Sequence, residues 1–378
     1  IYNTAQRKMN SLSPVFYVIV AFVLAAFGFM LTYHYESLTG TTQIRRNGLI
    51  ATTWNMAAIN NNPFEYWITY DKDDSYEKIM KDVANFIKNP GELDVPVENV
   101  FTTAMYDELA AGMKAKGVSD TDMEKVNTIW TDDFKNRKIV SGFLTDSVLG
   151  KKRLTSMPDR VTNTISGVDA NGAAVSVLRP TVINCYEGAD LSNKDAWWGA
   201  WRSFVLDESV STTSGGVVTT KQVFQLFSKI KHSKYPTLTE EEEAISIPLQ
   251  VVSIAIFDSV LIHIMNHIAP TKWQPLRQEM CDNLNRKKNQ ISQKILVDQY
   301  SGSDVVFLQE VSKAFVDLMK QLPSSLGDAA VAAVGGIEEH SGHGGSLSHY
   351  YHVYAPTSMN DGSSTRDQNS VILLKKHR

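Results

Sequence analysis

Two runs of apolar residues each end on a polar side chain, one near the start of the chain and one near its end. Residues 48–55 end on Asn55, and residues 303–310 end on Glu310. Short continuous apolar runs of this kind predict buried strands. Loop-closure entropy grows only slowly with loop length, and a folded insertion shortens the effective loop. We therefore expect the two strands to be neighbours in one sheet.

The long stretch between these strands is dominated by helical periodicity. Residues 75–88 place apolar side chains at helical spacing and stop at Asn-Pro-Gly. Similar patterns predict further helices at 100–116, 120–148 and 273–300. An Asp-Ala-Asn-Gly turn at 169–172 predicts a hairpin. The middle of the chain is therefore expected to be a mostly helical insertion into an α/β domain.

The predicted helix at 273–300 is amphipathic and carries several basic residues. A charged helix face is usually solvated. We therefore place these basic residues on the solvent-exposed side of the helix: Arg277, Arg286, Lys287, Lys288 and Lys294.

Residues 15–33 form an uncharged apolar run close to the start of the chain. At about 1.5 Å rise per residue, a helix over this run is about as long as a bilayer's apolar layer is thick. Tyr17 and Tyr33 lie near its ends, as interfacial aromatic residues do. An uncleaved secretory signal is the alternative, but its apolar region is usually shorter. We predict a transmembrane helix at 15–35 behind a tail at 1–14, with the N-terminus on the inner side.

A second apolar stretch at 245–268 contains Gln250, Asp258, His263 and Asn266. Such polar groups are costly in lipid. A buried core helix is the favoured interpretation, and packing against a membrane or a partner subunit is the alternative.

The amino-acid composition limits the classes of protein to which this chain can belong. The net charge of -4 does not favour a protein that coats nucleic acid, which is usually basic, and leaves specific nucleic-acid substrates open. The chain has two cysteines, Cys185 and Cys281, too few for a disulfide framework or a zinc site. Because cysteine is often buried as a thiol, two unpaired thiols are favoured over one disulfide.

The residue types at the two strand ends suggest a metal. An Asn and a Glu side chain offer the oxygen ligands that Mg²⁺ takes, and Mg²⁺ bound in this way assists phosphoester chemistry. Asn55 and Glu310 are therefore the candidate metal residues. Structural capping of the strand ends is the alternative role for both.

Three segments, in order, resemble the endonuclease/exonuclease/phosphatase superfamily, the deoxyribonuclease-I-like fold. They are Thr53–Met56 (TWNM), Asp304–Val311 (DVVFLQEV) and Arg366–Leu374 (RDQNSVILL). The resemblance implies that Asn55 belongs to a metal site, that Glu310 is the chief Mg²⁺ ligand, and that Asn369 and Ser370 line the cleft. It implies hydrolysis of a phosphodiester, with nucleic acid as one possible substrate.

The sequence departs from the superfamily after the third segment. Its terminal Ser-Asp-His is not present, and Asp367-Gln-Asn369 precedes the strand that an Asp-x-Asn motif should follow. Such a domain lacks a general base for water. We expect either further residues beyond Arg378 or another chain that completes the sheet.

The predicted fold is α/β (α+β): a partial two-layer β-sandwich with a large helical insertion and one N-terminal transmembrane helix. Its sandwich segments are 45–75 and 273–378, and the insertion is 76–272. The predicted function is a single-pass membrane phosphoesterase in an undetermined compartment. The alternative is a pseudoenzyme that serves as an accessory subunit among other membrane-protein subunits.

Overall fold

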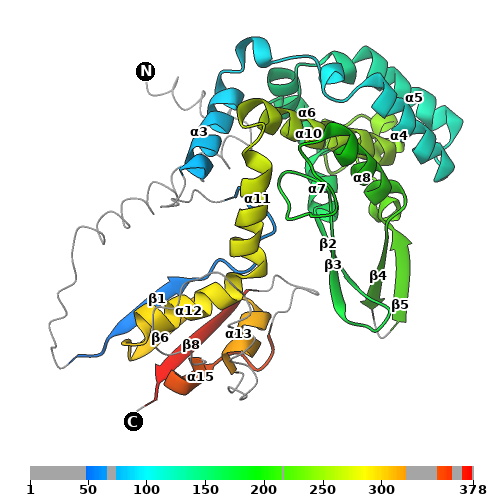
Figure 1. Ribbon diagram of the computed structural model, residues 1–378. Helices are drawn as coiled ribbons and strands as arrows, with labels where there is room; N and C mark the ends of the chain where they lie inside the picture. Colours follow the sequence, from blue (N-terminus) through cyan, green and yellow to red (C-terminus); the bar gives the residue numbers. More distant parts are fainter. Residues whose placement is uncertain (1–47, 66–73, 215–216, 321–346, 360–367, 377–378) are drawn as a thin grey trace, which may run out of the picture. The chain divides into compact units, whose positions relative to one another are not determined.

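The computed structural model describes residues 48–65, 74–214, 217–320, 347–359 and 368–376 (Figure 1). The predicted tail at 1–14 and transmembrane helix at 15–35 lie outside these residues. The chain forms two compact units, and the expected mixture of helices and strands is confirmed. Unit 1 is the described part of Phe64–Gln278; unit 2 is the described part of Thr42–Pro63 and Glu279–Arg378.

A four-stranded sheet forms the centre of unit 2. Its order is β1 (Ala51–Asn55), β6 (Val305–Val311), β8 (Asn369–Lys375) and β7 (Tyr351–Tyr354). Strands β1 and β6 are parallel, and the other two pairs are antiparallel. The expectation that the two apolar runs are neighbouring strands is therefore confirmed.

Three helices pack with this sheet to form the core of unit 2 (Figure 1). They are α12 (Lys288–Tyr300), α13 (Lys313–Lys320) and α15 (Leu347–Tyr350). The sheet contributes alternate side chains, as the two-residue period of a strand requires; its main contributions are Val306, Leu308, Val311, Tyr351, Val371 and Leu373. The described residues of unit 2 contain this sheet and no second one, so they show one layer of the predicted sandwich.

Unit 1 is mostly helical. Its helices are α3 (Ser75–Lys88), α4 (Thr103–Ala115), α5 (Asp120–Asp132), α6 (Ser147–Lys152), α7 (Ser156–Thr162), α8 (Lys194–Leu206), α9 (Glu240–Ala244) and α10 (Ser246–Ile268). Helix α11 (Trp273–Cys281) follows them. The predicted helix at 120–148 ends at Asp132, and a π-helical turn, η4 (Ile139–Leu144), lies beyond it.

Two hairpins complete unit 1. Strands β2 (Thr164–Val168) and β3 (Ala174–Leu178) are antiparallel, which confirms the hairpin predicted from the Asp-Ala-Asn-Gly turn. Gly172 has a φ of 80°, a conformation that glycine adopts without steric cost. Strands β4 (Ser209–Ser214) and β5 (Val217–Gln222) form the second hairpin.

Helix α10 is long and apolar enough to cross a membrane, but 78% of its apolar window is buried within the protein. The prediction of a buried helix is confirmed. Two of its polar side chains have partners in the protein: Ser259 donates to the Val100 carbonyl at 2.7 Å, and Gln250 donates to the Ser228 carbonyl at 2.9 Å. Satisfied polar groups of this kind are compatible with a protein core.

The helix predicted at 273–300 is interrupted. Helix α11 ends at Cys281, a π-helical turn, η6 (Asp282–Arg286), follows, and α12 starts at Lys288. The prediction that every basic residue of this helix faces solvent was also wrong. The Arg277 side chain is fully buried and donates to backbone carbonyls, including that of Tyr186 at 2.7 Å. Backbone carbonyls accept hydrogen bonds from the guanidinium and allow it to be buried. The periodicity of the helix does not reveal such partners.

Both cysteines, Cys185 and Cys281, are disulfide-bonded, so the expectation of two unpaired thiols was wrong. Both are also buried. Burial is common to thiols and disulfides, so only the fold distinguishes them.

Candidate metal centre at the edge of the sheet

Asn55 and Glu310 meet where strands β1 and β6 end. The two strands are parallel, so their carboxyl ends lie at the same edge of the sheet, and Asn55 is opposite Gln309. The Asn55 amide Nδ2 donates to Glu310 Oε1 at 3.1 Å. The expected proximity of these two side chains is confirmed.

A β-bulge turns Glu310 toward this edge. Leu308 and Val311 both face the core, although a regular strand would place one of them on the opposite face. The pairing of β6 with β8 shifts between these two residues. Glu310 is the extra residue, with a left-handed φ of 52°. Bulges often re-aim a side chain next to an active site, and this φ costs about 1–3 kcal/mol.

The side-chain amide of Asn55 orients the carboxylate. Its Oδ1 accepts a hydrogen bond from the Ala57 N–H at 2.8 Å, while Nδ2 faces the Glu310 carboxylate. A backbone N–H only donates and a carboxylate only accepts, so the two neighbours determine which way the amide is turned. In this arrangement Asn55 holds Glu310 in place, and direct metal ligation through Oδ1 stays a prediction.

Gln368 completes the shell around Glu310. Its Nε2 donates to Glu310 Oε2 at 3.0 Å, so each carboxylate oxygen has one side-chain donor. Gln368 was not among the predicted site residues, although it immediately precedes Asn369. The sequence signal that could have identified it is its position, as a polar residue directly before a predicted strand.

The structure places Asn369 and Ser370 on different faces of strand β8. The Asn369 side chain is only 6% exposed and donates to the Val311 carbonyl at 3.0 Å, next to the bulge. Ser370 is exposed on the opposite face. Of residues 368–370, it is Gln368 that contacts Glu310. The cleft-lining role of Asn369 and Ser370 stays a prediction.

Lys288 stabilises the loop that follows β1. Its ammonium group donates to the carbonyls of Ala57, at 3.2 Å, and Ala58. Both alanines have a left-handed φ, 54° and 40°. Burial lowers the pKa of Lys288 to about 8, although the nearby charge of Glu310 acts in the opposite direction. Lys288 therefore combines a structural role with a positive charge close to the carboxylate.

The donor set fits a hard, hydrated cation. Each Glu310 oxygen accepts one hydrogen bond from a side-chain amide and keeps a lone pair for a metal. Asn55 is exposed and Glu310 half-buried, which leaves space for metal-bound water. The described residues contain no cluster of three or more His, Cys, Asp or Glu side chains. Mg²⁺ is typically held by one or two carboxylates with water and phosphate, whereas Zn²⁺ needs three or four protein ligands.

Comparison with known proteins gives one match. The family model of a domain of unknown function (DUF8234) matches residues 94–278. No curated protein and no solved structure matches the chain. The matched segment includes neither Asn55 nor Glu310, so a functional assignment depends on the geometry of the site itself.

Proposed function

We propose that unit 2 is a phosphoesterase domain of the endonuclease/exonuclease/phosphatase type. In this proposal the chain hydrolyses a phosphodiester with Mg²⁺ and is held at a membrane by a helix at 15–35. The contact between Asn55 and Glu310 at the carboxyl ends of β1 and β6 is the observation that carries it. The order of the three resembling segments supports the same assignment.

Each side chain at the site has a distinct role in this proposal. Glu310 binds the cation, and the amides of Asn55 and Gln368 fix the direction of its two oxygens. Lys288 holds the loop after β1 through the Ala57 and Ala58 carbonyls. When bound, Mg²⁺ polarises a phosphoryl oxygen and offsets the charge that develops in the transition state.

The uncovered face of the sheet supports the two-layer form of the fold. Phe307, Ile372 and Tyr354 are 41%, 42% and 56% exposed. They form one apolar row, because Ile372 pairs with Phe307 on one side and with Tyr354 on the other. Exposed apolar area costs about 25 cal/mol per Å² relative to burial. A second sheet packed on this face would bury the row and complete a sandwich.

Hydrolysis of bis(p-nitrophenyl) phosphate by the intact membrane protein tests the proposal. Mg²⁺ should support turnover, and Glu310→Gln should remove both turnover and Mg²⁺ binding measured by calorimetry. Asp317→Asn is the matched control, since it removes one exposed carboxylate from the same unit. Equal Mg²⁺ affinity of Glu310→Gln and the native protein would contradict the metal role.

The same apolar row favours a second candidate function, an accessory subunit of a membrane complex. A partner protein would then cover Phe307, Ile372 and Tyr354. This candidate predicts stable co-purification with other membrane proteins in mild detergent, and loss of that association in Ile372→Lys. Mg²⁺ binding without turnover, together with such association, would favour this role over the enzyme.

A further inference from the structure

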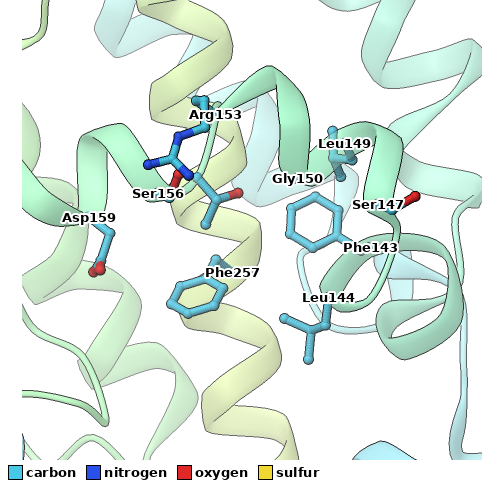
Figure 2. Close-up of a pocket in the computed structure, with 10 residues that line it drawn as sticks. Phe143, Leu144, Ser147, Leu149, Gly150, Arg153, Ser156, Asp159 and Phe257 are labelled. Atoms are coloured by element: carbon cyan, nitrogen blue, oxygen red, sulfur yellow. The ribbon is translucent and has the colours of Figure 1, made fainter. Parts of the chain in front are cut away.

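A cavity of about 240 Å³ lies within unit 1 (Figure 2). Four elements contribute to it: the π-helical turn η4, helix α6, helix α7 and the middle of helix α10. Figure 2 shows Arg153, Ser156 and Asp159 on one side and Phe143, Leu144 and Leu149 on the other. The cavity lies within the segment that matches the domain of unknown function.

Most of the cavity wall is apolar. Phe143 and Leu144 come from η4, and Phe257 comes from α10. π-Helical turns are rare and frequently lie at functional sites. A wall of this composition suits an aromatic or aliphatic group.

Arg153 is the one unmatched charge at this cavity. It follows helix α6 in a left-handed conformation, with a φ of 65°. Its Nε is buried and has no hydrogen-bond partner. Among the described residues its guanidinium makes no hydrogen bond and no ion pair. The side chain as a whole is half-buried, and Nε is its buried atom without an acceptor. A buried donor without a partner is costly.

Asp159 does not neutralise Arg153, because it is already paired. Its Oδ1 lies 2.6 Å from Nη2 of the fully buried Arg179. Arg179 also pairs with the fully buried Asp258, whose Oδ2 lies 2.8 Å from the guanidinium Nε. Both carboxylates, Asp159 and Asp258, therefore pair with Arg179, and neither is paired with Arg153. The arrangement therefore leaves an anion-binding group at Arg153.

We propose that this cavity binds a small carboxylate with an apolar body. The carboxylate pairs with the planar guanidinium of Arg153, which matches its two oxygens. The apolar body lies against Phe143 and Phe257, and the Ser156 hydroxyl offers a further hydrogen bond. The volume is below the roughly 300–1,000 Å³ of pockets for drug-sized ligands. A monoanion is favoured over a phosphate dianion, because Arg153 supplies one charge and Asp159 lies nearby.

The test is calorimetric titration of the full chain, held in lipid nanodiscs, with phenylacetate and with 2-phenylethanol. The two probes share an aromatic body and differ in charge. Phenylacetate should bind at least about tenfold more tightly, as expected for hydrogen bonds to a charged group. Arg153→Gln should lose this preference and Arg153→Lys should keep part of it. Arg160→Gln, an exposed arginine of α7, is the matched control and should bind as the native protein does.

Thermal melting separates a binding role from a structural one. Because Arg153→Gln removes an unsatisfied buried nitrogen, the ligand-free variant should melt at the same temperature as the native protein or higher. A lower melting temperature would show that Arg153 is structural and would overturn the proposal. Equal affinity for the two probes, or no binding of phenylacetate, would also overturn it. Leu144→Trp, which fills the cavity, should weaken phenylacetate binding independently of Arg153.

Discussion

The candidate metal centre of unit 2 and the cavity of unit 1 both contain strained backbone, but the two sites differ in how neighbouring groups compensate for the strain. The non-glycine residues with positive φ in the described chain lie at these two places: Ala57, Ala58 and Glu310 at the sheet edge, and Arg153 at the cavity. At the sheet edge, Asn55 and Gln368 donate hydrogen bonds to the Glu310 carboxylate, and Lys288 donates to the backbone carbonyl of Ala57. At the cavity the strained residue carries a guanidinium without an acceptor.

This difference teaches where a ligand is needed. Strain persists only where surrounding structure over-determines it, and it is concentrated at functional sites. At the sheet edge, hydrogen bonds already hold the Glu310 carboxylate in one orientation, so the proposed cation would find it in place. At the cavity, the proposed anion would supply the acceptor that Arg153 Nε lacks.

The largest expected effect concerns the ion pair behind the cavity. Asp258→Asn removes a charge partner from the buried Arg179 and weakens the acceptor of Trp201 Nε1, 2.8 Å away. Removing one partner of a buried pair typically costs about 3–5 kcal/mol. Urea unfolding should show a loss of that size, whereas the exposed Asp317→Asn should lose less than about 1 kcal/mol. A loss for Asp258→Asn as small as the control's would mean that Arg179 is satisfied without this carboxylate.

The next effect concerns the amides that orient Glu310. If Glu310 binds Mg²⁺, Asn55→Ala and Gln368→Ala should each weaken Mg²⁺ binding about 10–100-fold, as outer-shell changes do. Calorimetry with Mg²⁺ measures this. Gln309→Ala is the control, because Gln309 donates to Thr53 Oγ1 at 3.2 Å and does not contact the carboxylate. An unchanged affinity in both variants would show that Glu310 does not need its donors.

A smaller effect tests backbone strain at the sheet edge. Ala58 has a φ of 40°, which glycine adopts at lower cost. Ala58→Gly should raise the free energy of unfolding by up to about 1 kcal/mol. Ala51→Gly, in the regular part of β1, should instead lower it by about 0.5–1 kcal/mol. Destabilisation by both changes would argue against strain at Ala58.

The smallest effect is a pH dependence from Lys288. Its pKa is lowered to about 8, mainly by burial, below the value of a lysine in an unfolded chain. Between these two values the unfolded state binds more protons, so Lys288 should make stability rise with pH through this window. Unfolding in urea at pH 7.5 and 9.5, without metal, should show a smaller rise for Lys288→Met than for the native protein. Lys294→Met, an exposed lysine of the same helix, should keep the native difference.

Helices and strands whose pattern lies within one contiguous segment of the sequence were largely predictable. The apolar runs ending at Asn55 and Glu310 are strands, and the apolar run around Asp258 is a buried helix. Periodicity and composition report the local environment of contiguous residues, which is why these predictions succeeded. The break between α11 and α12 was missed, because residues 282–288 contain no proline or glycine to mark it.

The sequence by itself determined which segments are apolar, where they stop, and which polar side chains stand at their ends. The tertiary structure decided which side chains meet there: Gln368 at Glu310, Lys288 at the Ala57 and Ala58 carbonyls, and Arg153 in its cavity. The physical reason is that register, bulges and burial arise from contacts between residues far apart in the chain. No pattern in a single segment specifies the partner that it will contact.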